Sequence, residues 1–150
     1  MAATLRPVTA ENWSAVAQLE VREDQRTFVA SNSYSLAQAA YEPGLTPVAV
    51  YADDTLVGFA MYTHEPWHGE FGIVRMMIDQ RHQGKGYGRQ AVLALNDLLR
   101  RLPGCNSIIL SVIKENTTGW QFYQRLGFVI FEEGEQEFWA RLTLPPSEPH

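Results

Sequence analysis

The sequence predicts an α/β (α+β) fold, a mixed central sheet of about six to seven strands with flanking helices. β-rich runs and helical patterns follow each other in the order βααβββαβαββ. One helical pattern separates two apolar runs, which predicts that these two strands are parallel neighbours, or nearly so. The chain has 150 residues, 45% of them hydrophobic, which is enough for one self-sufficient core. We expect one domain over residues 1–143 and a disordered tail over residues 144–150.

The first half of the chain predicts a strand, two helices and a hairpin. "TLRPV" is a short first strand, and Thr9 caps the helical run that follows. Trp13, Val16 and Val21 return to one face of that helix. A second helix runs from about Ser35 to Tyr41, where a Pro-Gly pair stops it. "PVAVYADDTLVGFAMYTH" is a hairpin, because two β-rich runs flank an Asp-Asp turn.

The second half predicts two strand-helix pairs and two last strands. "EFGIVRMMID" is an extended run that leads into a glycine-rich turn. From Gly88 to Arg101, apolar residues recur at helical spacing, and a Pro-Gly pair closes the helix. Ser107 to Val112 is bounded by turn residues, as a buried strand would be, and Thr117 to Leu126 suits a helix ended by a glycine. "FVIFEE" and "EFWARLTL" supply the last two strands.

Charge and cysteine content limit the classes of partner. Twelve Lys and Arg against seventeen Asp and Glu give a formal charge of -5, which disfavours a nucleic-acid partner and favours a cationic one. The sequence shows neither a signal-peptide pattern nor an apolar run of membrane-spanning length, so we expect no membrane partner and a cytoplasmic location. The single cysteine, Cys105, cannot form an internal disulfide, which agrees with a reducing compartment.

Three glycines alternate in the turn between the fourth predicted strand and the third predicted helix. Gly84, Gly86 and Gly88 let the backbone approach a ligand closely and adopt positive φ where required. The first amides of a helix lack internal partners and carry the positive end of its dipole. Lys85 and Arg89 add positive charge. The pattern therefore predicts a site for a phosphate or a pyrophosphate.

The spacing of these glycines excludes two familiar nucleotide motifs. A Walker loop needs Ser or Thr after its Lys, and a dinucleotide fingerprint needs GxGxxG after an early strand. Arg81, Gly84 and Gly86 instead resemble the (Q/R)xxGx(G/A) signature of the GNAT superfamily of N-acetyltransferases. "VIKENTTGWQFYQRLGF" is similar to a later segment of that family, and the element order looks like its fold. "LVGFAMY", "RMMIDQRHQGKGYGRQA" and "FYQRLGF" look most like bacterial diamine and spermine/spermidine N-acetyltransferases.

The resemblance implies acetyl-CoA as cosubstrate. It implies that backbone amides of the glycine turn bind the pyrophosphate and that the pantetheine arm lies along the end of the fourth strand. A backbone N–H there can stabilise charge on the thioester oxygen. The expected cofactor-binding residues are Met76, Met77, Ile78, Arg81, Gln83, Gly84, Lys85, Gly86, Tyr87, Gly88, Arg89, Asn116 and Tyr123.

Tyr123 is the candidate general acid. A phenol stays protonated at neutral pH and can donate to a departing thiolate, and many members of the resembling family use a tyrosine at the matching position. The alternative is a tyrosine that only packs between the helix and the sheet. Asn116 is expected to contact the pantetheine arm, and a helix-cap role is compatible with that contact.

The sequence does not identify the general base. An ammonium acceptor must lose a proton, and Glu23, Asp24, Glu70 and Asp79 are the candidates, acting directly or through water. Each of them can equally be a solvated surface charge. Glu23, Asp24 and Glu70 are also the expected substrate-side residues. Further acidic residues suit a polycation by charge: Glu20, Glu132, Glu133, Glu135 and Glu137.

"HEPWH", from His64 to His68, matches the HExxH zinc pattern only in its letters. Pro66 lies between the histidines, a strand-like run precedes them and Gly69 follows, so the helix that this zinc site requires is not expected. We expect no metal site and a loop between the third and fourth strands.

The leading interpretation is an acetyl-CoA-dependent N-acetyltransferase for a small cationic amine, a diamine or a polyamine such as spermidine or spermine. The alternatives are another small amine, a peptide N-terminus, or a module that senses acyl-CoA without turnover. Such a sensor would not need Tyr123. Members of the resembling family are often dimers, and the last strands are candidate edges for a homodimer.

Overall fold

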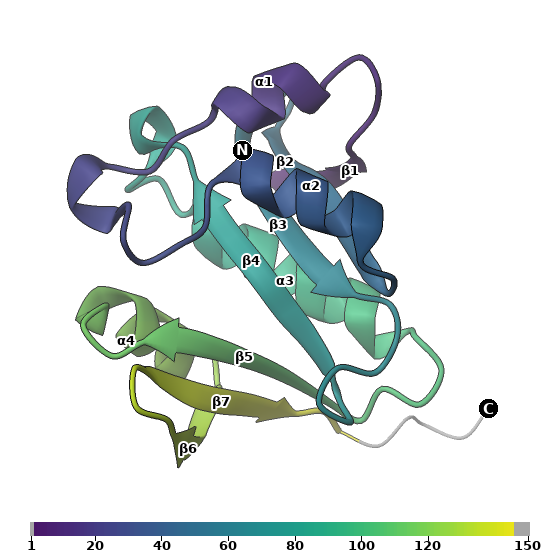
Figure 1. The fold of residues 1–150 in the computed structure, drawn as a ribbon, viewed down its shortest axis with the longest axis vertical. Helices are drawn as coiled ribbons and strands as arrows, with labels where there is room; N and C mark the ends of the chain where they lie inside the picture. Colours follow the sequence, from purple (N-terminus) through teal and green to yellow (C-terminus); the bar gives the residue numbers. More distant parts are fainter. Residues whose placement is uncertain (1, 146–150) are drawn as a thin grey trace.

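A seven-stranded sheet forms the centre of the computed structural model, which describes residues 2–145 (Figure 1). The strand order is β1-β2-β3-β4-β5-β7-β6. The β4–β5 pair is parallel and the other neighbouring strands are antiparallel, so the predicted mixed sheet is confirmed. The strands are β1 (Ala3–Pro7), β2 (Leu45–Ala52), β3 (Thr55–Thr63), β4 (Phe71–Ile78), β5 (Ser107–Ile113), β6 (Val129–Glu133) and β7 (Glu137–Thr143).

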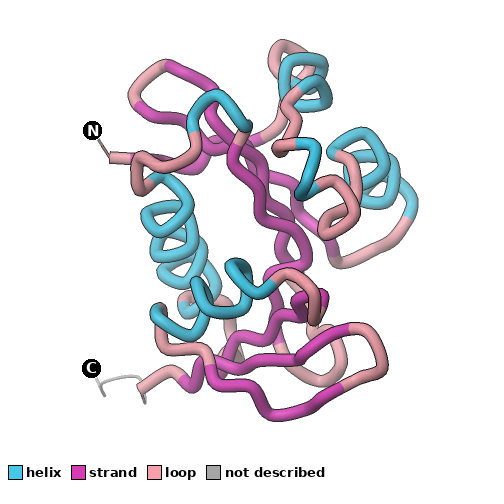
Figure 2. The backbone as a smooth tube through the Cα atoms, turned by 90° about the vertical axis from the view of Figure 1, so that its left-hand side faces the viewer, coloured by secondary structure: helices cyan, strands magenta, loops and turns pink. Residues whose placement is uncertain are grey.

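Helices cover both faces of the sheet (Figures 1 and 2). The first two helices pack with Phe59 and Met61 on one face, and the third and fourth pack on the other. Two short 3-10 turns, η1 (Glu23–Gln25) and η2 (Gln80–His82), were not predicted from the sequence. The helices are α1 (Trp13–Gln18), α2 (Asn32–Tyr41), α3 (Tyr87–Arg100) and α4 (Thr117–Arg125).

The apolar face of α3 supplies much of the core. Val92, Leu95 and Leu99 recur at helical spacing and are fully buried against β4 and β5. Each such side chain stabilises the fold by roughly 1.5–3 kcal/mol relative to an exposed one. This packing fixes the N-terminus of α3, and with it the glycine turn, beside the end of β4.

The first helix is shorter than the sequence predicts. It ends at Gln18, so Val21 lies in the segment that follows and not on the helix. The reason is tertiary: Glu20 N–H donates to Asp79 Oδ1 (3.0 Å), and Glu20 O accepts from Gln80 N–H (2.8 Å). The second helix begins earlier than predicted, because Ser31 Oγ caps it by accepting from Tyr34 N–H (3.1 Å).

Strands β4 and β5 pair at their beginnings and then separate. The register joins Phe71 with Ile108 and Gly72 with Ile109, and no further pair follows among the described residues. On its other side, β4 carries a bulge: Met61 faces Arg75 and Tyr62 faces Ile73, which leaves Val74 as the extra residue. A bulge bends a strand, and here it accompanies the separation of β4 from β5. The two separated edges frame the cleft described below.

At the C-terminal end, Leu144 continues past β7 with an ordered contact. Its N–H donates to Asn106 O (3.0 Å), one residue beyond the expected domain end. Residues 146–150 of the expected tail lie outside the described residues. Within residues 2–145, no helix has the length and apolar character that crossing a bilayer requires.

Candidate active site

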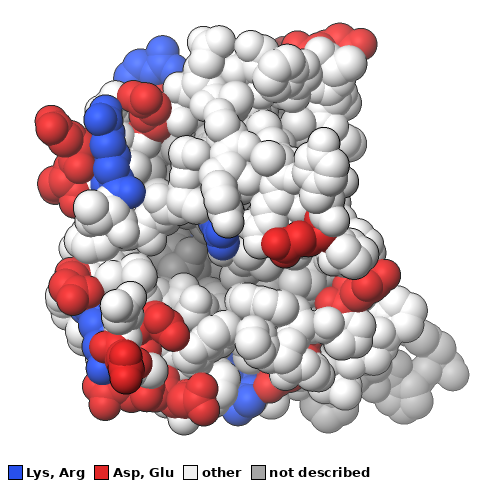
Figure 3. All heavy atoms as spheres, viewed as in Figure 1, with Lys and Arg blue, Asp and Glu red and all other residues white. Residues whose placement is uncertain are grey.

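A cleft of about 810 Å³ opens between the separated edges of β4 and β5. Residues 73–78 of β4 and 110–113 of β5 line it, and both edges lack a strand partner there. The glycine turn closes one end, and residues 27–30, between η1 and α2, form a further wall. Figure 3 shows the hollow between the part of the molecule that carries α1 and α2 and the part that carries β5 to β7. An extended ligand can therefore pair with free strand edges and reach a helix N-terminus.

The glycine turn has the geometry that an anionic ligand needs. Gly84 and Gly86 have φ of +79° and +85°, and a Cβ at either position would meet no atom within 4 Å, so the space beside both is open. The first bond of this helix turn runs from Gln90 N–H to Gly86 O (3.2 Å). The amides before Gln90 therefore have no acceptor within the helix. These features fit the diphosphate of coenzyme A.

The predicted cofactor residues do not all lie on the cleft. Arg81 and Lys85 are outside its lining, and Arg81 is instead held by Asp79. Tyr87 is buried beneath the turn, with Val57 and Ala91, and anchors the start of α3. The structure places the following predicted residues on the cleft: Met76, Met77, Ile78, Gln83, Gly84, Gly86, Tyr87, Gly88, Arg89, Asn116 and Tyr123.

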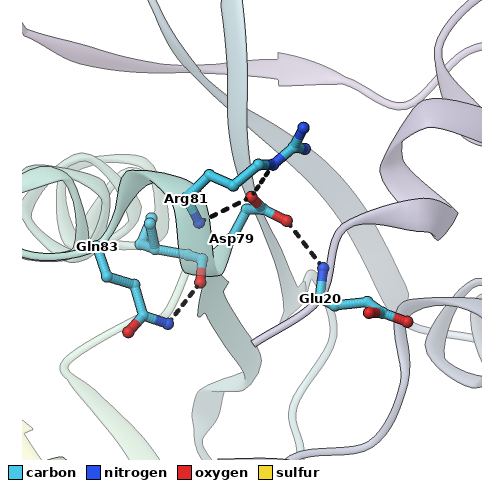
Figure 4. A network of polar contacts seen from close by, with 5 residues as sticks. Glu20, Asp79, Arg81 and Gln83 are labelled. Atoms are coloured by element: carbon cyan, nitrogen blue, oxygen red, sulfur yellow. Dashed lines mark hydrogen bonds and ion pairs between the residues drawn. The ribbon is translucent and has the colours of Figure 1, made fainter. Parts of the chain in front are cut away.

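Asp79 organises the junction between β4 and the glycine turn (Figure 4). Its carboxylate accepts from Arg81 Nε (2.8 Å), from Arg81 N–H (3.1 Å) and from Glu20 N–H (3.0 Å). Burial raises the pKa of Asp79, but the hydrogen bonds from Arg81 and Glu20 outweigh it, so the pKa lies below the ordinary value. The carboxylate stays charged with its oxygens occupied, which suits a structural role better than that of a general base.

Tyr123 lies in α4 and borders the cleft. Its ring packs edge-to-face with Phe122 (5.0 Å between centroids) and with Phe128 (5.7 Å), which limits its orientation. Burial raises the pKa of Tyr123 above the ordinary value, so the phenol keeps its proton across the neutral range. Tyr123 is packed in this way and also lies on the cleft, so its role as general acid stays a prediction.

Asn116 caps the helix that carries Tyr123. Its Oδ1 accepts from Gly119 N–H (3.0 Å), and its side chain also lines the cleft. The predicted cap is therefore present at a position that faces the site.

The predicted substrate-side carboxylates lie away from the cleft. Glu23 and Asp24 belong to η1, are exposed and are outside the cleft lining. Glu70 lines a separate cavity of about 550 Å³, where Arg141 donates to its two oxygens (2.6 and 2.9 Å). The hydrogen bond from Arg141 is the main reason why the pKa of Glu70 lies below its ordinary value. The structure thus does not bring these three residues together.

Further residues line the cleft, and one of them, Glu137, is among the acidic residues predicted to suit a polycation. Residues 27–30 supply a largely apolar wall, and Glu137, at the start of β7, also lines the cleft. Arg75 lies half-buried beneath α2, where its Nη2 donates to Gln38 Oε1 (3.2 Å) and its Nε has no partner. Burial lowers the pKa of Arg75. The apolar run "FVA" between two helices was the one available signal for the apolar wall, whereas Arg75 resembles an ordinary strand residue in the sequence.

The two histidines of "HEPWH" face different partners. His64 Nδ1 lies 2.6 Å from Thr46 Oγ1, and the His68 ring packs against Trp67 and Trp139. Among residues 2–145, no three His, Cys, Asp or Glu side chains are grouped as metal ligands would be.

Comparison with known proteins agrees with this geometry. A profile of the acetyltransferase (GNAT) family matches residues 11–128. The spermine/spermidine N(1)-acetyltransferase of Bacillus subtilis (strain 168) is 34% identical over 144 residues, which cover 92% of this chain and 93% of that protein.

Two solved structures share the fold. Spermidine N-acetyltransferase from Vibrio cholerae, in complex with CoA and spermine, has a TM-score of 0.68 at 20% identity and covers 93% of this chain and 92% of its own. PaiA N-acetyltransferase from Thermoplasma acidophilum, in complex with coenzyme A, has a TM-score of 0.71 at 16% identity and covers 96% of this chain and 100% of its own. From the profile match and the Bacillus relative, the chain belongs to the acetyltransferase (GNAT) family and is an N-acetyltransferase with acetyl-CoA as its cosubstrate.

Proposed function

We propose that this enzyme acetylates a primary amine of a small polycation, a diamine or a polyamine such as spermidine or spermine. The observation that carries the proposal is that the glycine turn, Tyr123 and the acidic residue Glu137 line a single cleft. The 34% identity with a spermine/spermidine N(1)-acetyltransferase, along almost the whole of both chains, supports the same acceptor class.

Backbone groups of the chain bind most of the cofactor. The free amides at the start of α3 bind the diphosphate, with Arg89 contributing charge from the cleft lining. The edge of β4 without a strand partner, at Met76, Met77 and Ile78, offers backbone groups to the amides of the pantetheine arm, with the Ile78 carbonyl already accepting from Gln83 Nε2. When bound, acetyl-CoA supplies the acetyl group as a thioester.

The acceptor end has opposite charges on its two walls. Arg75 lies beneath α2, and Glu137 lies across the cleft on β7. Figure 3 shows acidic side chains gathered along the lower rim of the hollow, over the part formed by β5 to β7. This region of the chain contains Glu115, Glu132, Glu133 and Glu135. An acceptor with several ammonium groups is attracted to this rim and repelled from Arg75.

Proton transfer is assigned to Tyr123 and to solvent. As the amine nitrogen bonds to the carbonyl carbon and the C–S bond breaks, Tyr123 Oη donates its proton as the general acid to the departing sulfur. The attacking nitrogen then loses one proton to give the neutral amide, and that proton returns through solvent to restore the phenol. The acceptor ammonium loses its proton to water, because Glu23, Asp24 and Glu70 are outside the cleft lining and the oxygens of Asp79 are occupied. A backbone N–H on the free edge of β4 stabilises negative charge on the carbonyl oxygen.

A thiol-release assay with a panel of amines tests the proposal. Putrescine, spermidine and spermine are compared with amino acids, a peptide with a free N-terminus and a simple monoamine. We expect kcat/KM for the polyamines to exceed that for the monoamine at least about tenfold, because a second ammonium gains from the acidic rim. Preferential acetylation of the peptide or an amino acid would overturn the acceptor assignment. Binding of acetyl-CoA without release with any amine would indicate a sensor.

A further inference from the structure

The two substrate-facing walls of the cleft are joined by side-chain hydrogen bonds. Gln83, directly before Gly84, donates from Nε2 to Ile78 O (2.9 Å) and to Gln25 Oε1 (2.9 Å). Gln25 ends η1, 58 residues earlier in the chain. Figure 4 shows the Gln83 amide directed at the end of β4. One amide group thus links the end of β4, the glycine turn and the acceptor-side segment.

Gln25 also holds the start of the acceptor wall. Its Oε1 accepts from Arg22 N–H (3.1 Å), and its backbone O accepts from Phe28 N–H (3.0 Å). Phe28 belongs to the wall Thr27–Ala30. A movement of Gln25 therefore changes the wall that the acceptor meets.

A second attachment lies five residues earlier in the chain, at Glu20. The backbone of Glu20 donates to Asp79 Oδ1 and accepts from Gln80 N–H, so the segment is attached to the residues around η2 at two points. Of the two attachments, the Gln25–Gln83 bond joins two side chains whose residues both line the cleft, whereas Glu20, Asp79 and Gln80 are outside the lining. It is the attachment that ligand binding can most readily strengthen or weaken.

We propose that Gln25 and Gln83 are positioning residues that couple the binding of acetyl-CoA to the binding of the amine acceptor. The proposal rests on the proposed function, in which the turn holds the diphosphate and Thr27–Ala30 faces the acceptor. A diphosphate on the turn fixes the backbone next to Gln83. The Gln83 amide then holds Gln25 and orders the wall, so each ligand binds more tightly when the other is present.

Linkage gives the coupling a measurable form. If coenzyme A tightens acceptor binding by some factor, the acceptor must tighten coenzyme A binding by the same factor. One neutral hydrogen bond can supply a factor of about five to ten. We expect the dissociation constant of coenzyme A to fall about fivefold in the presence of saturating spermidine.

Calorimetry on three variants of the full chain tests the role of the bond. Gln25→Leu removes the acceptor atom and should reduce the factor to about one, while coenzyme A alone still binds. Gln25→Glu keeps oxygens for Gln83 Nε2 and Arg22 N–H, so it should retain most of the factor. Gln18→Leu is the control, because Gln18 is an exposed glutamine of α1 that bonds to Ser14. An unchanged factor in Gln25→Leu would overturn the proposal.

Hydrogen exchange with coenzyme A alone makes the test independent of the acceptor. In the wild type, coenzyme A should slow amide exchange in residues 84–90 and also in residues 22–30. In Gln25→Leu, the slowing should be confined to residues 84–90. Wild-type protection that stops at the turn would overturn the coupling but leave the proposed function intact. Conversely, protection of both segments without polyamine turnover would retain the coupling and reject the acceptor.

Discussion

Asn116 and Gly119 are in direct contact at the start of α4. Asn116 Oδ1 accepts the Gly119 N–H at 3.0 Å, and a Cβ on residue 119 would overlap the Asn116 side-chain amide. The contact explains a glycine inside a nine-residue helix, where its intrinsic propensity is poor. Because the same helix carries Tyr123, this local contact helps to set the position of the candidate acid.

Gly119→Ala should therefore destabilise the protein. The new Cβ displaces Asn116, and a lost N-cap costs about 0.5–2 kcal/mol in the free energy of unfolding. Urea denaturation measures the change. Gly88→Ala is the matched control, because its Cβ would meet the Phe122 ring at an ordinary 3.7 Å and alanine favours the helix. An equal loss of stability in both variants would contradict the assigned contact.

Most of the fold could be predicted because its signals are local. The periodicity of Val92, Leu95 and Leu99 and the Asp-Asp turn of the hairpin each depend on a few neighbouring residues. The early end of α1 could not be predicted, because it depends on hydrogen bonds from Glu20 to residues 59 and 60 positions away. The 3-10 turns depend on similar contacts, such as that of Gln25 with Gln83.

The candidate site likewise has one part that the sequence predicts and another that it does not. Gly84 and Gly86 form a contiguous motif, and their predicted role needs only a strand before them and a helix after them. The cleft also brings together Phe28, Arg75 and Glu137 from three distant segments. Their proximity depends on the bulge in β4 and on its separation from β5, and neither feature has a local sequence pattern.

Tyr123→Phe should lower kcat by about 10²-fold or more, because the proton donor is lost while both aromatic contacts are kept. The affinity for acetyl-CoA should change less than about twofold, since the ring volume is nearly unchanged. Steady-state kinetics and calorimetry separate the two effects.

The pH profile provides a second check on Tyr123. The raised pKa means that Tyr123 loses its proton only well above pH 9, so its ionisation should cause no loss of wild-type activity between pH 7 and 9. An alkaline loss of kcat in that range that disappears in Tyr123→Phe would contradict the burial assigned to the phenol.

Gly86→Ala should weaken acetyl-CoA binding more than it destabilises the fold. The backbone at residue 86 has φ of +85°, which costs alanine about 1–2 kcal/mol even though the space around it is open. The added methyl group also lies where the diphosphate is proposed to approach. Gly86→Asn separates the two effects, because asparagine tolerates positive φ but still obstructs the turn. The unfolding temperature of Gly86→Asn should be nearer to that of the wild type than the unfolding temperature of Gly86→Ala is. Calorimetry should show weak cofactor binding in both variants.

Glu70→Gln should reduce stability in a pH-dependent way. The pKa of Glu70 is lowered in the folded chain, chiefly by the hydrogen bond from Arg141. A carboxyl of this kind contributes stability above its unfolded pKa and loses it as the pH falls through the folded value. The substitution should cost about 1 kcal/mol at pH 7, a modest figure because 36% of the Arg141 side chain is exposed. The difference from the wild type should shrink below about pH 4.5.

Urea titrations between pH 3 and 7 measure this difference for Glu70→Gln and for a control pair on the surface. Asp54→Asn removes the partner of Arg6 at a carboxylate that is 98% exposed, so it should have almost no effect at any pH in the range. Acetyl-CoA binding should be unchanged in Glu70→Gln at pH 7, because Glu70 lines the separate cavity and not the cleft. A stability difference that stays constant down to pH 3 would mean that folding does not lower the pKa of Glu70. Loss of cofactor binding would instead mean that the two cavities are linked through β4.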